Sequence, residues 1–326
     1  MSDVAREAGV SLATVSRAIN EPEKLSAEKL ALVRAAVERL GYVPNLNAGS
    51  LASAGGKSRI VAAIVPTVAN VVFSETVDAL AQTLARGGYQ LLLGQTSYRS
   101  GDEEGLVEAF LGRRVDGLVL TGTTQSASLR AKLKRAGIPV VQTWDLMDKP
   151  IDMLVGFSNF EVGRAAAEHL IARGHRGLGF IGAQEERSRQ RLEGFRAGAA
   201  AHGVADVQAE LILPPVDIAD AGPRFAQMAS RCPELNAVFC NNDMLAAGVV
   251  FECHQRGWAV PQRMAVLGLG DLPIARAAFP RLSTVEVRRG QIGTRAGQML
   301  LSRLSGERSG ADIVDLGFEV VTRAST

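Results

Sequence analysis

Apolar residues recur at helical spacing through the first forty positions, and this pattern predicts three short helices. The first covers 4–8, the second 12–20 and the third about 27–40. Ser11 and Ser26 can cap the second and third helices, and Ser2 or Asp3 can cap the first. The third helix is predicted to bury a stripe of residues three or four apart, namely Leu30, Val33, Val37 and Leu40. Two short helices crossed by a third form the helix-turn-helix arrangement.

The pattern changes over residues 44–58, which we interpret as a conditional hinge. Pro44 and Asn45 favour the start of a helix, whereas Gly49 and the glycine- and serine-rich stretch after it weaken that helix. Short helices are only marginally stable alone. We therefore expect this segment, which contains Leu51, to fold only against a partner.

From Ile60 onward, short β-rich apolar runs alternate with amphipathic helical stretches. The predicted strands are 60–65, 89–93, 115–120, 138–141, 178–181, 210–213, 237–240 and 264–267. The predicted helices between them include 75–86, 103–111, 128–136, 162–173 and 190–201. The alternation starts again after residue 156, which predicts an α/β fold of two doubly wound parallel-sheet lobes. Residues 313–321 are expected to form one last strand.

These patterns divide the 326 residues into a head, a hinge and a larger domain. The head covers 1–43, the hinge helix and linker 44–58, and the effector-binding and dimerisation domain 59–326. The first lobe is expected to take about 59–155 and 286–312, and the second about 156–285 and 313–326. Ligands of such sheets bind at the carboxyl ends of the strands, so we expect the ligand site between the lobes.

Composition narrows the class of protein. The net charge is only +2, so any contact with DNA must come from a local surface and not from overall charge. The three cysteines form no CxxC pair, which suits a reducing compartment. The first turns carry charged residues and no apolar run approaches 18 residues, so neither a signal peptide nor a membrane partner is expected. We expect a cytoplasmic protein.

Two enzyme-like motifs fail on context and two others are absent, so neither catalysis nor a cofactor is expected. Gly177–Gly182 matches GxGxxG, but an apolar strand lies inside the motif instead of before it. Residues 55–58 mimic the end of a phosphate loop, yet Leu51 stands where that motif needs glycine. The four histidines lack metal-ligand spacing, and no serine lies in a GxSxG context.

A long ordered motif carries a family resemblance. The run DVAREAGVSLATVSRAIN, from Asp3 to Asn20, and LGYVPN, from Leu40 to Asn45, resemble the head of the LacI/GalR repressors. The likeness extends over essentially the whole chain, and segments 155–164, 239–257 and 315–318 are most similar to the gluconate-operon repressor subgroup. The resemblance implies periplasmic-binding-protein type I lobes, a homodimer and a near-palindromic double-stranded DNA operator.

One departure from the family concerns the start of the chain. Family members usually carry several residues before the Asp-Val-Ala motif, including a phosphate-contacting cap. Here Met1 and Ser2 precede it directly. We expect either that the start is assigned late or that Ser2 caps the first helix, and DNA affinity is the property this would change.

By resemblance, the second helix reads DNA in the major groove. The implied base-reading residues are Leu12, Ala13 and Arg17, of which Arg17 offers a two-pronged donor to guanine. The implied phosphate contacts are short polar side chains, namely Ser11, Thr14, Ser16 and Asn20. Asn45 belongs to the hinge signature, and Leu51 matches a leucine that wedges between base steps in the minor groove. Val15 and Ile19 are read as core.

The resemblance and the strand ends together give a candidate effector site. Its residues are Thr67, Asn70, Phe73, Asp145, Arg187, Arg191, Asn242 and Asp271. Arg187 and Arg191 lie four apart and would form a fork for a carboxylate or phosphate; the alternative is a solvated basic face. In many relatives an acid stands at the position of Gly270, which bears on the role of Asp271.

We interpret the chain as a sequence-specific DNA-binding regulator of sugar or sugar-acid catabolism, a repressor or an activator. The expected effector is gluconate or a related aldonic acid, with a phosphorylated sugar as the alternative. A transport-type sugar receptor would share the two lobes but need a signal peptide and no head. A dehydrogenase or sugar kinase would need a phosphate loop.

Overall fold

The computed structural model describes residues 1–43, 57–69, 71–99, 101–307 and 310–326. The chain forms two compact units, 1–58 and 59–326, and each is described by itself. Asn45, Leu51 and most of the predicted hinge lie outside the described residues, as do Asn70 and the side chain of Asn20.

The first unit is a three-helix head. Its elements are α1 (Ser2–Glu7), α2 (Leu12–Asn20), the short 3-10 helix η1 (Pro22–Lys24) and α3 (Ala27–Arg39). Its buried centre consists of Val4 from α1, Val15 from α2, and Val33 and Ala36 from α3. This is the predicted helix-turn-helix.

Two of the three predicted caps of the head are confirmed. Ser11 Oγ accepts a hydrogen bond from Thr14 N, and Ser26 Oγ accepts one from Lys29 N. The Ser2 cap is wrong, because the N-cap is Met1 and no side chain caps α1. Leu40 is also misplaced in the buried stripe: it lies just past the end of α3 and is 45% exposed.

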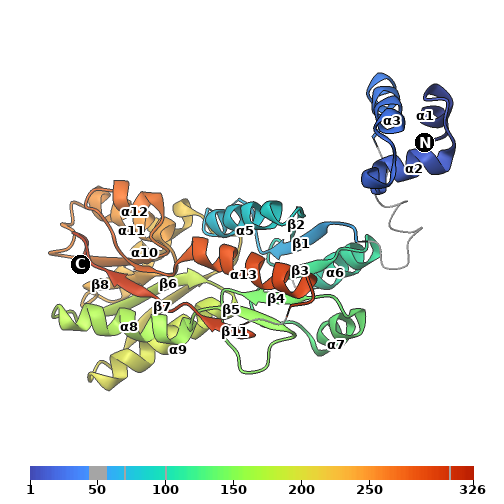
Figure 1. The fold of residues 1–326 in the computed structure, drawn as a ribbon. Coiled ribbons are helices and arrows are strands. Elements are labelled where there is room, and N and C mark those ends of the chain that lie inside the picture. The colour runs from blue at the N-terminus through green and yellow to red at the C-terminus, as the bar shows by residue number, and fades with distance from the viewer. Residues whose placement is uncertain (44–56, 70, 100, 308–309) are drawn as a thin grey trace. The chain divides into compact units, whose positions relative to one another are not determined.

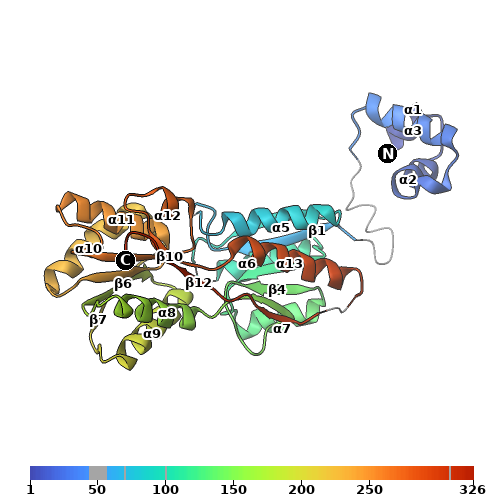
Figure 2. The ribbon, with the colours of Figure 1, turned by 60° about the vertical axis from the view of Figure 1, so that its left-hand side comes forward.

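The second unit contains two six-stranded sheets, each defining one lobe (Figures 1 and 2). The first-lobe sheet has the order β11-β5-β4-β3-β1-β2 and is parallel throughout. Its strands are β1 (Ile60–Val65), β2 (Gln90–Gln95), β3 (Gly117–Thr121), β4 (Val140–Thr143), β5 (Met153–Gly156) and β11 (Ile313–Asp315). Its helices are α5 (Ser74–Arg86), α6 (Asp102–Gly112), α7 (Ala127–Ala136) and α13 (Arg289–Leu304).

The second-lobe sheet has the order β12-β10-β9-β8-β6-β7 and is parallel except for the β10–β12 pair. Its strands are β6 (Leu178–Ala183), β7 (Val207–Ile212), β8 (Ala237–Cys240), β9 (Ala265–Leu269), β10 (Ser283–Glu286) and β12 (Glu319–Val321). Its helices are α8 (Asn159–Ala172), α9 (Glu186–Ala201), α10 (Ile218–Arg231), α11 (Asp243–Gln255) and α12 (Pro273–Ala277).

Side chains alternate along each central strand and pack into two separate cores, one on each face of the sheet. In β1, Val61 and Ala63 pack towards α5 and α13, whereas Ala62 and Ile64 pack towards α6 and α7. In β8, Phe239 packs towards α8 and α9, and its neighbours on either side along the strand pack towards α10 and α11. Both sheets are therefore buried on two faces, as parallel sheets require.

The chain passes between the two sheets three times: after β5, after β10 and after β11. The single strand predicted over 313–321 is therefore wrong. Residues 313–315 pair with β5 in the first lobe, and 319–321 pair with β10 in the second. The turn at Gly317, with φ +64°, separates them. The predicted lobe boundary at 312 accordingly moves beyond Asp315.

Candidate functional site

The head presents one face of α2 to the outside. Leu12 is 50% exposed, and Ala13 and Arg17 are exposed with it, whereas Val15 is fully buried. The predicted base-reading residues thus share the face opposite the core. Thr14 and Ser16 are half-buried at its flanks. Residues 1–43 carry six basic and six acidic side chains, so the head has no net charge to hold DNA non-specifically.

A cavity of about 490 Å³ lies between the two lobes, at the carboxyl ends of their strands. Loops after β1, β2, β3 and β4 supply its first-lobe wall, and the segment after β6 supplies the second-lobe wall. The lining includes Pro66, Thr96, Tyr98, Gln125, Asp145, Glu185 and Arg187. Its volume is in the range of small-molecule sites.

Arg187 is the cation in the second-lobe wall of this cavity. It is 7% exposed, its Nε donates to Glu185 Oε2 at 2.9 Å, and its guanidinium lies 5.3 Å from the ring centroid of Phe73 in the first lobe. Its Nη1 is buried and has no hydrogen-bond partner in the described part of the chain. A buried donor without an acceptor is costly, so this nitrogen is suited to an anion that enters the cavity.

Arg191 lies one turn further along α9 but is already engaged. Its Nε donates to Asn159 Oδ1 at 2.9 Å, and its Nη1 donates to Asn241 Oδ1. Burial lowers the pKa of Arg191 to about 10, against the opposing effect of Glu185. The two arginines share one helix face as predicted, yet their roles differ: Arg187 offers a donor, and Arg191 organises the amides behind it.

Glu185 and Tyr98 are among the cavity residues that the sequence analysis missed. Burial raises the pKa of Glu185, but Arg187 and Arg191 outweigh it, so this pKa is lowered overall and the carboxylate is held ionised. Burial likewise raises the pKa of Tyr98, with Arg187 opposing it. The acid two residues before Arg187 was a usable signal for Glu185. Tyr98 gave none, because it lies in the loop after β2.

Asp145 lines the cavity and ties the lobes together. Its Oδ2 accepts from Thr123 Oγ1 at 2.6 Å and, across the cleft, from Gln190 Nε2 at 3.3 Å. Its Oδ1 accepts from Leu146 N at 2.9 Å and from Asn159 Nδ2 at 3.1 Å. Four donors therefore hold this carboxylate in place, and two of them come from the second lobe.

The other predicted effector residues have local partners. Thr67 Oγ1 accepts from Ala69 N at 3.1 Å, and Phe73 packs edge-on against Trp144. Asn242 Oδ1 caps α11 by accepting from Leu245 N at 2.9 Å. Asp271 pairs with Arg323 at 2.7 Å and with Arg276 at 3.7 Å. None of these four predicted residues is among those that line the cavity.

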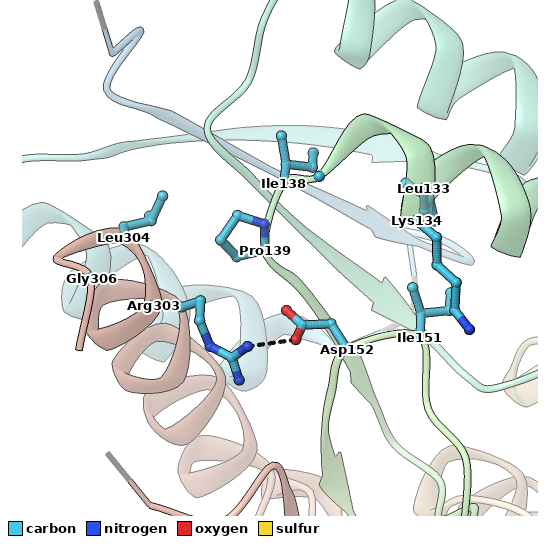
Figure 3. Close-up of a pocket in the computed structure, with 10 residues that line it drawn as sticks. Leu133, Lys134, Ile138, Pro139, Ile151, Asp152, Arg303, Leu304 and Gly306 are labelled. Carbon is cyan, nitrogen blue, oxygen red and sulfur yellow. Dashed lines mark hydrogen bonds and ion pairs between the residues drawn. The ribbon is translucent and has the colours of Figure 1, made fainter. Parts of the chain in front are cut away.

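A second cavity, of about 510 Å³, lies at the opposite ends of β4 and β5 (Figure 3). Arg303 bridges Asp152 at 2.8 Å and Asp312 at 2.7 Å, and Asp152 also accepts from Val140 N at 3.2 Å. Leu133, Ile138, Pro139 and Ile151 make up much of the remaining wall. Because these charges satisfy one another, the interlobe cavity is the better candidate site.

Comparison with known proteins decides the family. A family model described as "Bacterial regulatory proteins, lacI family" matches residues 1–45, and one described as "Periplasmic binding protein-like domain" matches residues 167–326. The HTH-type transcriptional regulator GntR of Pseudomonas aeruginosa is 40% identical over 328 residues, which cover 100% of this chain and 95% of the relative. The chain belongs to the LacI family of bacterial regulatory proteins. GntR of Escherichia coli K12 is 34% identical, over 98% of this chain and 96% of the relative.

Solved structures agree with this LacI-family assignment. A LacI-family transcriptional regulator from Silicibacter pomeroyi is 31% identical, with a TM-score of 0.93 over 99% of this chain and 98% of the other. GntR from Chromobacterium violaceum is 36% identical, with a TM-score of 0.79 over 82% of this chain and 98% of the other. A lac repressor dimer bound to operator and an anti-inducer is 25% identical, with a TM-score of 0.84 over 99% and 98%.

The chain is therefore a LacI-family, DNA-binding transcriptional regulator with a helix-turn-helix head and a periplasmic-binding-protein-like domain. None of the helices in the described residues has the length and apolar character needed to span a bilayer.

Proposed function

We propose that this regulator is a homodimeric repressor of sugar-acid catabolism, and that gluconate or a related aldonic acid is its effector. Two GntR regulators are 40% and 34% identical to it over nearly the full chain. In this proposal Leu12, Ala13 and Arg17 contact bases of a near-palindromic operator, and Ser11, Thr14, Ser16, Asn20, Asn45 and Leu51 support them. Because its target in this proposal is operator DNA, we propose that the protein acts in the cytoplasm.

One observation carries the choice of an anionic effector: the buried, unpartnered Nη1 of Arg187 beside the interlobe cavity. A carboxylate accepts a charge-assisted hydrogen bond there without displacing Glu185 from Nε. A neutral sugar would supply only a hydroxyl oxygen to the same donor. Arg187 thus favours sugar acids over neutral sugars of the same length.

The contacts across the cleft support a coupling between effector and operator. Arg187 of the second lobe lies over Phe73 of the first, and Gln190 donates to Asp145. An effector bound between these residues changes the relative free energies of the open and closed lobe arrangements. In a dimer, that change of arrangement alters the spacing of the paired heads, and with it the affinity for operator.

Exposed aromatic side chains on the second lobe support the dimer. Phe279 is 86% exposed and Phe251 is 46% exposed. They belong to neighbouring parts of the fold, since α11 contacts α12, the helix that precedes Phe279. Large exposed aromatics of this kind are enriched at protein interfaces.

The effector is tested by thermal shift and titration calorimetry with gluconate and glucose on the full-length protein. Gluconate should raise the melting temperature, whereas glucose at the same concentration should not. Arg187→Gln should weaken gluconate binding about 10- to 100-fold, the usual value of a charged hydrogen bond. Arg189→Gln is the matched control, because Arg189 lies on the same helix, is 61% exposed and pairs with Glu186.

Stabilisation by glucose equal to that by gluconate would refute the aldonic-acid effector. An Arg187→Gln variant that melts like the parent without ligand and binds gluconate as tightly would refute only the role of Arg187. Operator binding, measured by fluorescence anisotropy with and without gluconate, then gives the sign of regulation. A repressor released by its effector should lose operator affinity when gluconate is added.

A further inference from the structure

A chain of buried amides leads from the first-lobe backbone to the interlobe cavity. The backbone N–H of Ile151 donates to Gln142 Oε1 at 2.7 Å, and Gln142 Nε2 donates to Gln125 Oε1 at 2.7 Å. Gln125 Nε2 in turn donates to Glu103 Oε1 at 3.1 Å. Gln142 is fully buried and Gln125 is 8% exposed. These side chains form a relay that ends on one carboxyl group.

The direction of this relay is fixed by its first donor. A backbone N–H can only donate, so the oxygen of Gln142 must face Ile151 and its nitrogen must face Gln125. The same logic turns the nitrogen of Gln125 towards Glu103. The relay therefore always presents a donor to Glu103, which favours the ionised carboxylate. Glu103 is also in the first turn of α6, where the helix dipole favours a negative charge.

Glu103 lines the same cavity as Arg187 but enters it from the first lobe. Burial raises the pKa of Glu103, and the hydrogen bond from Gln125 opposes this rise without cancelling it. Asp145 and Glu185 line this cavity as well. Among the described residues, the lining holds two arginines, the exposed Arg99 and the buried Arg187, against five acidic side chains, and this excess of acids opposes a second negative charge on the ligand.

We propose that Glu103 is a specificity-determining residue of the effector site. Its carboxylate accepts a hydrogen bond from a hydroxyl of the effector far from the acid group, and it excludes effectors that are phosphorylated at that end. A hydroxyl can donate to Glu103, whereas a phosphate ester has only acceptors and up to two negative charges. This inference rests on the proposed function, because it assumes that Arg187 holds the acid group.

Titration calorimetry on the full-length protein with gluconate and its 6-phosphate tests the proposal. The parent protein should bind gluconate at least about 100-fold more tightly, as expected when a site places like charges together. Glu103→Gln should reduce this preference about tenfold or more. Glu108→Gln is the matched control on the same helix: Glu108 is 60% exposed, pairs with Lys132 and does not line the cavity. It should keep the parent preference.

The outcomes separate this inference from the proposed function. If neither acid binds the parent protein, the aldonic-acid effector is refuted. If gluconate binds but Glu103→Gln leaves the preference unchanged, only the role of Glu103 is refuted. Should Glu103→Gln melt well below the parent, Glu103→Asp serves instead. Aspartate keeps the negative charge but its side chain is one methylene shorter. This variant should therefore bind gluconate more weakly and still reject the 6-phosphate.

Discussion

At the scale of single residues, the polar groups of the interlobe site differ in whether their hydrogen-bonding atoms already have partners. Arg191 is held by Asn159 and Asn241, and Asp145 accepts from four donors. Arg187 alone among these three keeps a buried nitrogen without a partner in the described residues. Fixed neighbours cost no reordering when a ligand arrives. In the proposed function, the free donor of Arg187 therefore selects for an anionic ligand, and the fixed groups reduce the cost of binding it.

Asp243 should make stability depend on pH. Its carboxylate accepts from Thr284 Oγ1 and Leu272 N, each at 2.6 Å, and burial raises its pKa from 3.8 to about 6 in spite of these bonds. A raised carboxyl pKa means that the folded state binds the proton more tightly. Its contribution to the free energy of unfolding, about 3 kcal/mol at full size, is present below pH 4 and lost as the pH rises through about 6.

The Asp243→Asn variant checks this sign, because asparagine cannot ionise. Denaturant unfolding of both proteins should show the variant gaining stability relative to the parent between about pH 4 and pH 6.5. Comparing the two proteins cancels the titration of all other groups. A stability difference that stays constant over this range would show that Asp243 does not titrate there.

Arg17 is expected to read a base. Arg17→Ala should cost about 1–3 kcal/mol at its own operator position and relax the preference there, as for a bidentate contact to guanine. Arg34→Ala removes the same charge from an exposed position on α3 and should weaken binding to all sequences alike, if at all. Binding to a panel of operator variants distinguishes the two. Unchanged selectivity in Arg17→Ala would remove Arg17 from the reading surface.

At the scale of elements, glycines let α8 and α9 approach closely beneath the site. A Cβ at Gly163 would lie 1.9 Å from the carbonyl oxygen of Arg191, and one at Gly194 would lie 1.8 Å from that of Phe160. Real side chains cannot stand so close to backbone atoms. The position of α9, and of the arginines on it, is therefore set by two residues without side chains.

Gly194→Ala should accordingly destabilise the protein by about 1–3 kcal/mol or more, as overpacking does, and weaken effector binding because α9 must move. Gly105→Ala is the control: it lies within α6 with no atom within 4 Å of an added Cβ, so it should stabilise the helix by about 0.5–1 kcal/mol. Urea unfolding measures both. Equal effects of the two substitutions would contradict the close packing of α8 and α9.

The elements also show what sequence patterns can and cannot predict. Strands β1 and β8 have their predicted bounds, because each is a continuous apolar run buried on both faces. Strands β5 and β10 were not predicted, although they have the same four-residue length as β8; β10 has the sequence STVE, which is not a continuous apolar run. The two short strands near the C-terminus merged into one prediction, because pattern does not reveal that neighbours in sequence join different sheets.

Only part of the candidate site could be predicted from the sequence. Asp145 could be placed at a strand end, and Arg187 was singled out by its four-residue spacing from Arg191; both line the cavity. Glu103 and Gln125 could not be predicted, because their roles depend on a relay through Gln142 that joins three separate segments. Hydrogen bonds between residues far apart in sequence leave no local pattern. Asn242 is the opposite case. Its residue type and its position after a strand suit a ligand site, yet its side-chain oxygen caps α11.

At the scale of the whole molecule, a head without net charge implies that operator affinity depends on pairing. Phe279→Glu should shift the protein from dimer to monomer in sedimentation equilibrium and reduce operator affinity, because one head then makes half of the contacts. Leu213→Glu is the control, since Leu213 is 75% exposed but follows β7, the opposite edge of the sheet from β12. A Phe279→Glu variant that remains a dimer would place the interface elsewhere.

The three passages between lobes have a genetic consequence. Residues 313–321 give an edge strand to each sheet, and Ser325, fully buried, accepts from Ser283 N and donates to Val266 O. A nonsense codon ahead of Ile313 would thus remove an edge strand from both sheets at once, although every residue of the head and of the interlobe cavity would remain. We expect such late-truncation alleles to behave as nulls, not as mild lesions.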